Sequence, residues 1–249
     1  MLYVFLFVLG AAMGSFLNVV ACRVQRGQSF LRGRSVCVHC GTQLHWHDLI
    51  PVASWLLLFG KCRYCKKHVS AQYLLSELAV GALAVLGAFV VTSPIHGLVY
   101  AAVVGFFTVL FIYDLRTYIV PDNIAIPAIV VIGGLNATMA GDGASLLLGA
   151  ASGGVWFLAQ FLVSRGRWVG GGDIRLGVLM GVLLGYPLVW LGLGFAYVGG
   201  SIVALALVAA TRLKLSSRMP FATLLLPATF AAWVWGEGAW DWYSRLVGL

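Results

Sequence analysis

Four of the five cysteines lie in two short repeats that have the spacing of metal ligands. The repeats are Cys37-Val38-His39-Cys40 and Cys62-Arg63-Tyr64-Cys65, and 21 residues separate them. Two residues between thiolates let one turn present both sulfur atoms to one ion, and two such turns complete a tetrahedron. The predicted ligands of a structural zinc ion are Cys37, Cys40, Cys62 and Cys65. Redox chemistry at these cysteines stays open as an alternative. So does replacement of one sulfur atom by a nearby histidine, namely His39, His45, His47 or His68.

Two of the eight acidic residues stand where they could share a proton. Asp114 ends the apolar run 105–113, and Asp173 follows the glycine triplet 170–172 at the start of another apolar run. If both runs cross a membrane, the two acids fall at the same face. Two carboxylates that lie close together cannot easily both ionise, so one proton is shared between them. The pair is therefore predicted to carry out acid–base chemistry.

The other acids have more ordinary explanations, with one exception. Asp122 follows a proline and is expected to cap a helix, and Asp48 is expected in a turn or cap. Glu77 lies about two turns into an apolar run, where an ionisable group is a functional candidate or reaches back to the interface. His96 is the one histidine outside residues 21–70. No Ser–His pair is placed as favourably for catalysis as Asp114 and Asp173 are, which argues against a serine protease.

The composition places these residues in an integral membrane protein. Of 249 residues, 61% are hydrophobic and 10% are charged, and the mean hydropathy is +0.96. Soluble domains have roughly 45–50% apolar and about 25% charged residues. Disordered, fibrous and disulfide-rich secreted chains are excluded as well. The expected fold is an all-α polytopic membrane protein with about eight transmembrane helices. The apolar runs are 2–20, 71–92, 97–113, 123–140, 144–163, 174–185, 187–210 and 220–236.

A small polar domain is inserted between the first two predicted spans. The expected organisation is a first transmembrane helix at 1–20, a zinc-binding domain at 21–70 and a membrane-embedded catalytic domain at 71–249. Within the polar domain, the segment 48–60 contains Trp55 and a short leucine run. It is too short to span a bilayer. We expect it to lie on the bilayer surface.

The basic residues predict the orientation of the chain. If the N-terminus lies outside the cytoplasm, 15 of the 16 Lys and Arg residues fall in inside segments, and only Arg245 lies outside. Cytoplasmic loops carry such an excess of positive charge. Residues 21–70 are then cytoplasmic and both termini are periplasmic. The cytoplasmic loops account for the net charge of +8, so the charge does not indicate a nucleic-acid partner, and none is expected.

The order of these motifs along the chain resembles that of the type IV prepilin peptidases, also called leader peptidase/N-methyltransferases. The resemblance covers nearly the whole chain. The matching residues are Gly14-Ser15-Phe16-Leu17-Asn18-Val19 with Arg23, the paired CxxC with Leu49-Ile50-Pro51-Val52-Ala53-Ser54-Trp55 between, Tyr73, Glu77, Asp114, Pro121-Asp122 and Gly170-Gly171-Gly172-Asp173-Ile174-Arg175-Leu176. The last of these is a GxGD motif.

The resemblance implies an aspartyl protease of the bacterial inner membrane. Such an enzyme cuts the short basic leader from prepilins or pseudopilins at the cytoplasmic face. Many members then methylate the new N-terminus with S-adenosylmethionine. The family roles carry over to Asp114 and Asp173 as the catalytic pair and to the four cysteines as metal ligands. No Gly-rich strand-to-helix fingerprint marks a binding site for S-adenosylmethionine.

The chain departs from the family pattern at two places. Arg175 stands where the family commonly has lysine, and the family motif Pro-Phe-Gly-Pro-Phe is reduced to Pro220-Phe221-Ala222-Thr223-Leu224. Two other functions are weighed against the peptidase. A proton-coupled transporter with a structural zinc domain would place its acids near the bilayer midplane and often shows repeated halves. A non-catalytic assembly protein that docks through the zinc domain would leave the aspartate pair unexplained.

Overall fold

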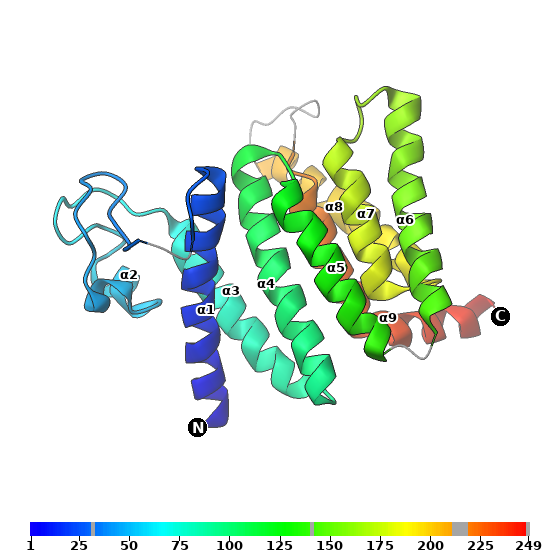
Figure 1. The fold of residues 1–249 in the computed structure, drawn as a ribbon, viewed down its shortest axis with the longest axis horizontal. Coiled ribbons are helices and arrows are strands. Elements are labelled where there is room, and N and C mark those ends of the chain that lie inside the picture. Colours follow the sequence, from blue (N-terminus) through cyan, green and yellow to red (C-terminus); the bar gives the residue numbers. More distant parts are fainter. Residues whose placement is uncertain (31–32, 140–141, 211–218, 248–249) are drawn as a thin grey trace. The chain divides into compact units, whose positions relative to one another are not determined.

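The computed structural model is built almost entirely of helices. It describes residues 1–30, 33–139, 142–210 and 219–247. In this part of the chain there is no β-strand, and the two isolated β-bridges lie within residues 36–68. The elements, shown in Figure 1, are α1 (Leu2–Gln25), η1 (Trp46–Leu49), α2 (Ala53–Leu57), α3 (Ala71–Val90), α4 (Pro94–Thr117), α5 (Asp122–Met139), α6 (Gly143–Ser164), α7 (Gly171–Leu184), α8 (Leu188–Ala210) and α9 (Ala222–Val247).

The expectation of an all-α polytopic membrane protein is confirmed. Within the described ranges, six helices are long and apolar enough to cross a bilayer, namely α1, α3, α4, α5, α6 and α8. Each of the eight apolar runs in the sequence coincides with one helix. At 14 residues, α7 is about 21 Å long, which is shorter than a hydrocarbon core of about 30 Å. At 26 residues, α9 is long enough but ends in a stretch that contains Glu237, Asp241 and Arg245.

The contacts divide the chain into two compact units, residues 1–92 and 93–249. In the first unit, α1 and α3 pack along one another. A Cβ atom on Gly10 would lie 2.5 Å from Ala84 Cβ, and one on Gly14 would lie 2.8 Å from the carbonyl oxygen of Ser76. Small residues at this four-residue spacing let two helix backbones approach closely. These two glycines therefore allow the close packing of α1 on α3.

In the second unit, α7 is enclosed by its neighbours. It packs on α5, α6, α8 and α9, and α4 packs on α5 and α9. The closest helix contact joins glycines of α6 and α7, where a Cβ on Gly149 would lie 2.6 Å from the carbonyl oxygen of Gly181. Large apolar side chains fill the space beside this contact, and Phe157, Leu176 and Met180 are fully buried. The polar first turn of α7 is therefore held in place by the tight packing of α7 on its neighbouring helices.

Some residues used for the orientation lie outside the described part of the chain. They are Arg32, Arg212, Lys214 and Arg218. The orientation itself stays a prediction.

Candidate active site and metal centre

Asp114 lies in the last turn of α4, in the second unit. Its residue surface is only 3% exposed. One carboxylate oxygen, Oδ2, accepts a hydrogen bond of 3.3 Å from the backbone N–H of Thr223 in the first turn of α9. The first N–H groups of a helix have no partner inside the helix, so they are suited to hold a carboxylate. The end of α4 and the start of α9 thus fix one acid in a buried position.

Asp173 lies in the first turn of α7, directly after the glycines. Its Oδ2 accepts a hydrogen bond of 2.7 Å from the backbone N–H of Gly170, and its own N–H donates to the Gly170 carbonyl at 3.1 Å. This reciprocal pair closes the N-terminus of α7, where a negative side chain is favoured. The second acid is half-buried and points along the start of its helix.

The connection after α4 brings the two acids toward each other. Val120 in this connection packs so closely on Gly172 that a Cβ there would lie 2.7 Å from Val120 Cβ. Asp173 lies close enough for its charge to act on the carboxyl group of Asp114. The structure therefore assembles, from α4 and α7, the two carboxylates that the sequence singled out.

The expectation that Asp122 caps a helix is corrected. Asp122 is the first residue of α5, and its Oδ2 pairs with Nη2 of Arg175 at 2.8 Å. Arg175 also donates from Nη1 to the carbonyl of Gly171 at 3.3 Å. The arginine thereby ties the start of α5 to the start of α7. The ion pair with Asp122 requires a cation at position 175. This requirement accounts for Arg175, which stands where the family commonly has lysine.

Sequence reasoning missed Thr223, whose backbone holds Asp114. The side chain of Thr223 donates from Oγ1 to the carbonyl of Pro220 at 2.6 Å, which shapes the turn before α9. The neighbouring Phe221 packs its ring on Phe157 with centroids 5.7 Å apart. Thr223 lies in the reduced family motif at 220–224. Its backbone N–H is the donor, however, and the identity of a side chain does not reveal a backbone donor.

The four cysteines of the paired repeats come together in the first unit. Their sulfur atoms all lie within 4.8 Å of one another, and the Sγ atoms of Cys37 and Cys65 are 3.9 Å apart. A zinc ion with four bonds of about 2.3 Å requires sulfur atoms about 3.8 Å apart. The cluster therefore fits a tetrahedral zinc ion in both donor type and spacing.

The two cysteine turns have the same backbone. In the first, Cys37 N–H donates to Thr42 O and Gly41 N–H donates to Cys37 O, both at 2.9 Å. In the second, Cys62 N–H donates to Lys67 O and Lys66 N–H donates to Cys62 O, again at 2.9 Å. Because the two turns have the same backbone, each presents its two sulfur atoms to the common metal site in the same way.

The protonation of the sulfur atoms favours a cation at this site. Hydrogen bonding with Thr42 lowers the pKa of Cys40 to about 6, so this sulfur is a thiolate at neutral pH. A backbone bond from Lys67 acts to lower the pKa of Cys65, but burial and the neighbouring sulfur atoms raise it to about 11. Four thiolates side by side repel one another, and a divalent cation removes that repulsion.

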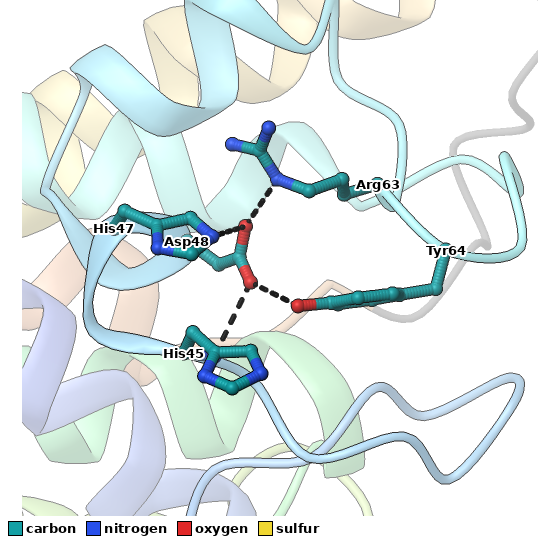
Figure 2. A network of polar contacts seen from close by, with 5 residues as sticks. All are labelled: His45, His47, Asp48, Arg63 and Tyr64. Carbon is teal, nitrogen blue, oxygen red and sulfur yellow. Dashed lines mark hydrogen bonds and ion pairs between the residues drawn. The ribbon is translucent and has the colours of Figure 1, made fainter.

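A polar network around Asp48 joins the segment 45–48 to the second cysteine turn (Figure 2). The carboxylate accepts bonds of 2.7 Å from Arg63 Nε, 2.9 Å from the Tyr64 hydroxyl and 3.2 Å from the His45 backbone, and His47 Nε2 lies 3.5 Å away. Burial acts to raise the pKa of Asp48, but the bonds from Arg63, Tyr64 and His45 outweigh it and hold the pKa below its usual value. The expected turn or cap residue thus also holds the second cysteine turn through Arg63 and Tyr64.

Glu77 is buried in α3 and holds a loop. It is 6% exposed, and its Oε2 accepts a hydrogen bond of 2.7 Å from the backbone N–H of Val52. Nearby, Asn18 of α1 is fully buried and donates to Ser76 of α3. Glu77 thus holds the loop before α2, and its two interpretations, a functional group or a side chain that reaches the interface, both stay predictions.

Comparison with known proteins identifies the family. The bacterial peptidase A24 N-terminal domain matches residues 8–91, and the type IV leader peptidase family matches residues 101–209. The prepilin leader peptidase/N-methyltransferase of Bacillus subtilis is 30% identical over 97% of this chain and 98% of its own length. The chain belongs to this family. The Myxococcus xanthus relative is 36% identical over 84% of this chain and 64% of its own length, and a Burkholderia pseudomallei relative is 31% identical over 89% and 81%. No solved structure matches the chain.

The matched family regions separate the two sites. The peptidase A24 N-terminal domain contains the four cysteines and Glu77, whereas the type IV leader peptidase region contains Asp114 and Asp173. The metal centre and the aspartate pair thus belong to different units of the chain.

Proposed function

We propose that this membrane protein removes the leader peptide from prepilins or pseudopilins, with Asp114 and Asp173 as its catalytic pair. The observation that supports this function most directly is the pairing of a buried carboxylate at the end of α4 with a second carboxylate at the start of α7. Membership of the prepilin leader peptidase/N-methyltransferase family supports the choice of substrate.

The aspartate pair supplies both proton transfers that peptide hydrolysis requires. The ionised carboxyl group takes a proton from water, and the oxygen of that water attacks the scissile carbonyl carbon. The protonated carboxyl group gives its proton to the carbonyl oxygen, which produces a tetrahedral diol. When the C–N bond breaks, the carboxyl group that took the proton from water gives it to the leaving amine. The other carboxylate takes a proton from a diol hydroxyl as the carbonyl re-forms, which restores the single shared proton. One shared proton suffices because the pair titrates as a unit.

The backbone around the pair leaves the substrate room to approach. Gly170 and Gly171 precede Asp173, and a Cβ on Gly171 would meet no atom within 4 Å. A side-chain-free segment lets an extended peptide backbone lie close to the carboxylate. We assign the start of α7 to the contact with the scissile bond.

Zinc at Cys37, Cys40, Cys62 and Cys65 has a structural role in this proposal. Four cysteine ligands leave no open coordination position for catalysis. When bound, the ion would join the two cysteine turns and contribute to the folding of the domain, in which most of the large apolar side chains are not buried. The aspartate pair, in the other unit, carries the hydrolysis.

The second activity proposed is methylation of the new N-terminal amine with S-adenosylmethionine as the methyl donor. It rests on the family alone, and we assign none of the described residues to the methyl donor. The location proposed is the bacterial inner membrane, with residues 21–70 in the cytoplasm.

The test is cleavage of a purified prepilin by metal-loaded variants in liposomes. Asp114→Asn and Asp173→Asn should each remove nearly all cleavage, because an amide can neither accept nor donate the required proton. Asp122→Asn is the matched control, since its carboxylate binds Arg175 and is 55% exposed, and it should retain most activity. Mass spectrometry of the product with and without S-adenosylmethionine reports methylation separately. Robust cleavage by either catalytic Asn variant would refute the mechanism.

A further inference from the structure

The short helix α2 and the turn that follows it at 58–60 present large apolar side chains outward from the metal-binding domain. Leu57 is 77% exposed and Phe59 is 82% exposed, and Leu56 beside them is also exposed. Leu57, Leu58 and Phe59 line one open hollow together with two lysines, Lys61 and Lys66. Apolar side chains with lysines at their border are typical of segments that lie in a membrane interface.

The domain fixes these side chains in the outward direction. Trp55 of α2 turns inward and donates from Nε1 to the carbonyl of Val69 at 3.3 Å. Its ring packs on Gly60, where a Cβ would lie 2.7 Å from the indole and where φ is +65°. With Trp55 held inside, Leu56 and Leu57 on the following positions face outward.

A second observation gives the depth at which α2 is attached. The N–H of Val52, just before α2, is bonded to Glu77, which lies six residues after the start of α3. At 1.5 Å per residue this position is about 9 Å along the helix. Because α3 is a candidate span of 20 residues, about the thickness of a hydrocarbon core, this attachment lies within the outer part of the span.

The attachment is maintained against backbone strain. Val52 has φ 62° and ψ −54°, and Ala53 N–H donates to the carbonyl of Pro51 at 2.6 Å, which closes a tight γ-turn. A β-branched residue is strongly disfavoured in this conformation. A buried carboxylate that holds a strained turn indicates that the position of α2 matters.

We propose that α2 is an interfacial anchor, with Leu56, Leu57 and Phe59 inserted at the boundary between lipid headgroups and acyl chains. Lys61 and Lys66 then face anionic headgroups. The charge of the surrounding domain favours this partner, since residues 21–70 contain eight Lys and Arg residues and a single acid, Asp48. Such a surface attracts an anionic bilayer and repels a basic peptide.

Photocrosslinking in proteoliposomes tests the anchor. A benzophenone amino acid replaces Leu57 or Phe59, and the vesicles contain phosphatidylethanolamine and phosphatidylglycerol. Leu75, exposed on the candidate span α3, is the positive control, and Val38, exposed on the first cysteine turn, is the negative control. Retained metal shows that each variant is folded. Lipid adducts at positions 57 and 59 should approach those at position 75 and exceed those at position 38 by about tenfold.

A charge variant tests the lysines. Lys61→Gln and Lys66→Gln should each lower the share of phosphatidylglycerol among the adducts, by up to about fivefold. Lipid adducts at 57 and 59 no more abundant than at 38 would overturn the proposal. Adducts to an added prepilin, or to a second copy of this chain, in place of lipid would overturn it as well.

Discussion

At the scale of single residues, the two cysteine turns differ at one position, where their shared backbone requires a positive φ. The residue four places after the first cysteine has φ +70° at Gly41 and φ 58° at Lys66. A residue with a Cβ costs roughly 1–2 kcal/mol in this region, and glycine does not. The first turn, with Gly41, is therefore free of this backbone strain, and the second turn, with Lys66, is strained.

Exchanging these residues should change metal retention in opposite directions. Lys66→Gly should stabilise the metal-bound domain by about 1 kcal/mol. Gly41→Ala should destabilise it by a similar amount, because no atom lies within 4 Å of the added Cβ and only the backbone strain remains. Competition with a chelator in detergent measures both changes. Equal retention in the two variants would contradict the assignment of strain.

Asp48 gives the domain a dependence on pH. Its pKa is lower in the folded domain than in the unfolded chain, so its contribution to stability is fully present above the unfolded pKa of about 3.9. That contribution is lost as the pH falls through the lower, folded pKa. Asp48→Asn should therefore destabilise the domain at neutral pH by roughly 1–2 kcal/mol, since Arg63 and Tyr64 lose a charged partner at a partly exposed site.

The pH series distinguishes the charge of Asp48 from its shape. The difference in thermal midpoint between the original chain and Asp48→Asn should stay constant down to about pH 5 and shrink only below about pH 4. A difference independent of pH throughout would show that the hydrogen-bond geometry, and not the carboxylate charge, stabilises the network.

The sequence indicated the chemistry of single residues better than their contacts. The cysteine cluster follows from the CxxC spacing, and the acids stand out because carboxylates are rare in this chain. The partners of Glu77 and Asp114 are backbone N–H groups, 25 and 109 residues away along the chain. Any residue except proline supplies such a donor, so side-chain patterns do not reveal it.

At the scale of helices, the contact between α6 and α7 depends on paired glycines. Gly177 faces the backbone of Gly153 on α6, and an added Cβ would overlap that backbone and the ring of Phe157. Because α7 carries Asp173 in its first turn, displacement of this helix also displaces the carboxylate. The sequence shows that Gly177 and Gly181 recur at a four-residue spacing, but it does not show which helix they contact.

Gly177→Ala should weaken both stability and cleavage. Overpacking against backbone costs typically 1–3 kcal/mol, so the thermal midpoint should fall by a few degrees. Gly194→Ala in α8 is the matched control, since no atom lies within 4 Å of its added Cβ. The control should be neutral or slightly stabilised, because alanine favours a helix interior over glycine. Equal effects of the two changes would refute the role of the close contact.

Helix positions were predictable because apolar runs and breakers are local signals. Gly185, Tyr186 and Pro187 stand at the end of one apolar run and the start of the next, and α7 ends at Leu184 while α8 begins at Leu188. Asp122 was misjudged because capping by a side chain and the first helical position look alike in sequence. Its ion pair with Arg175 depends on how α5 meets α7, which no local pattern contains.

At the scale of the whole molecule, chain connectivity relates the orientation to the active site. If α1 enters the cytoplasm, residues 21–70 would lie inside, α3 would lead out and α4 back in, and Asp114 would fall at the cytoplasmic face. The next pair, α5 and α6, would lead out and in again, so that Asp173 would start α7 at that same face. One choice of orientation therefore places both acids and the metal-binding domain on one side of the membrane.

Labelling of intact cells with a membrane-impermeant maleimide tests this orientation. Ser244→Cys in α9 should be labelled from outside, and Ser29→Cys in the polar domain only after the membrane is permeabilised. The expectation rests on the 15 Lys and Arg residues assigned to the inside against one outside, an asymmetry that governs orientation when it lies near the ends of spans. Both variants carry Cys22→Ser, and bound zinc protects the four cysteines of the cluster. Labelling of Ser29→Cys in sealed cells would reverse the topology, and it would place the aspartate pair on the periplasmic face.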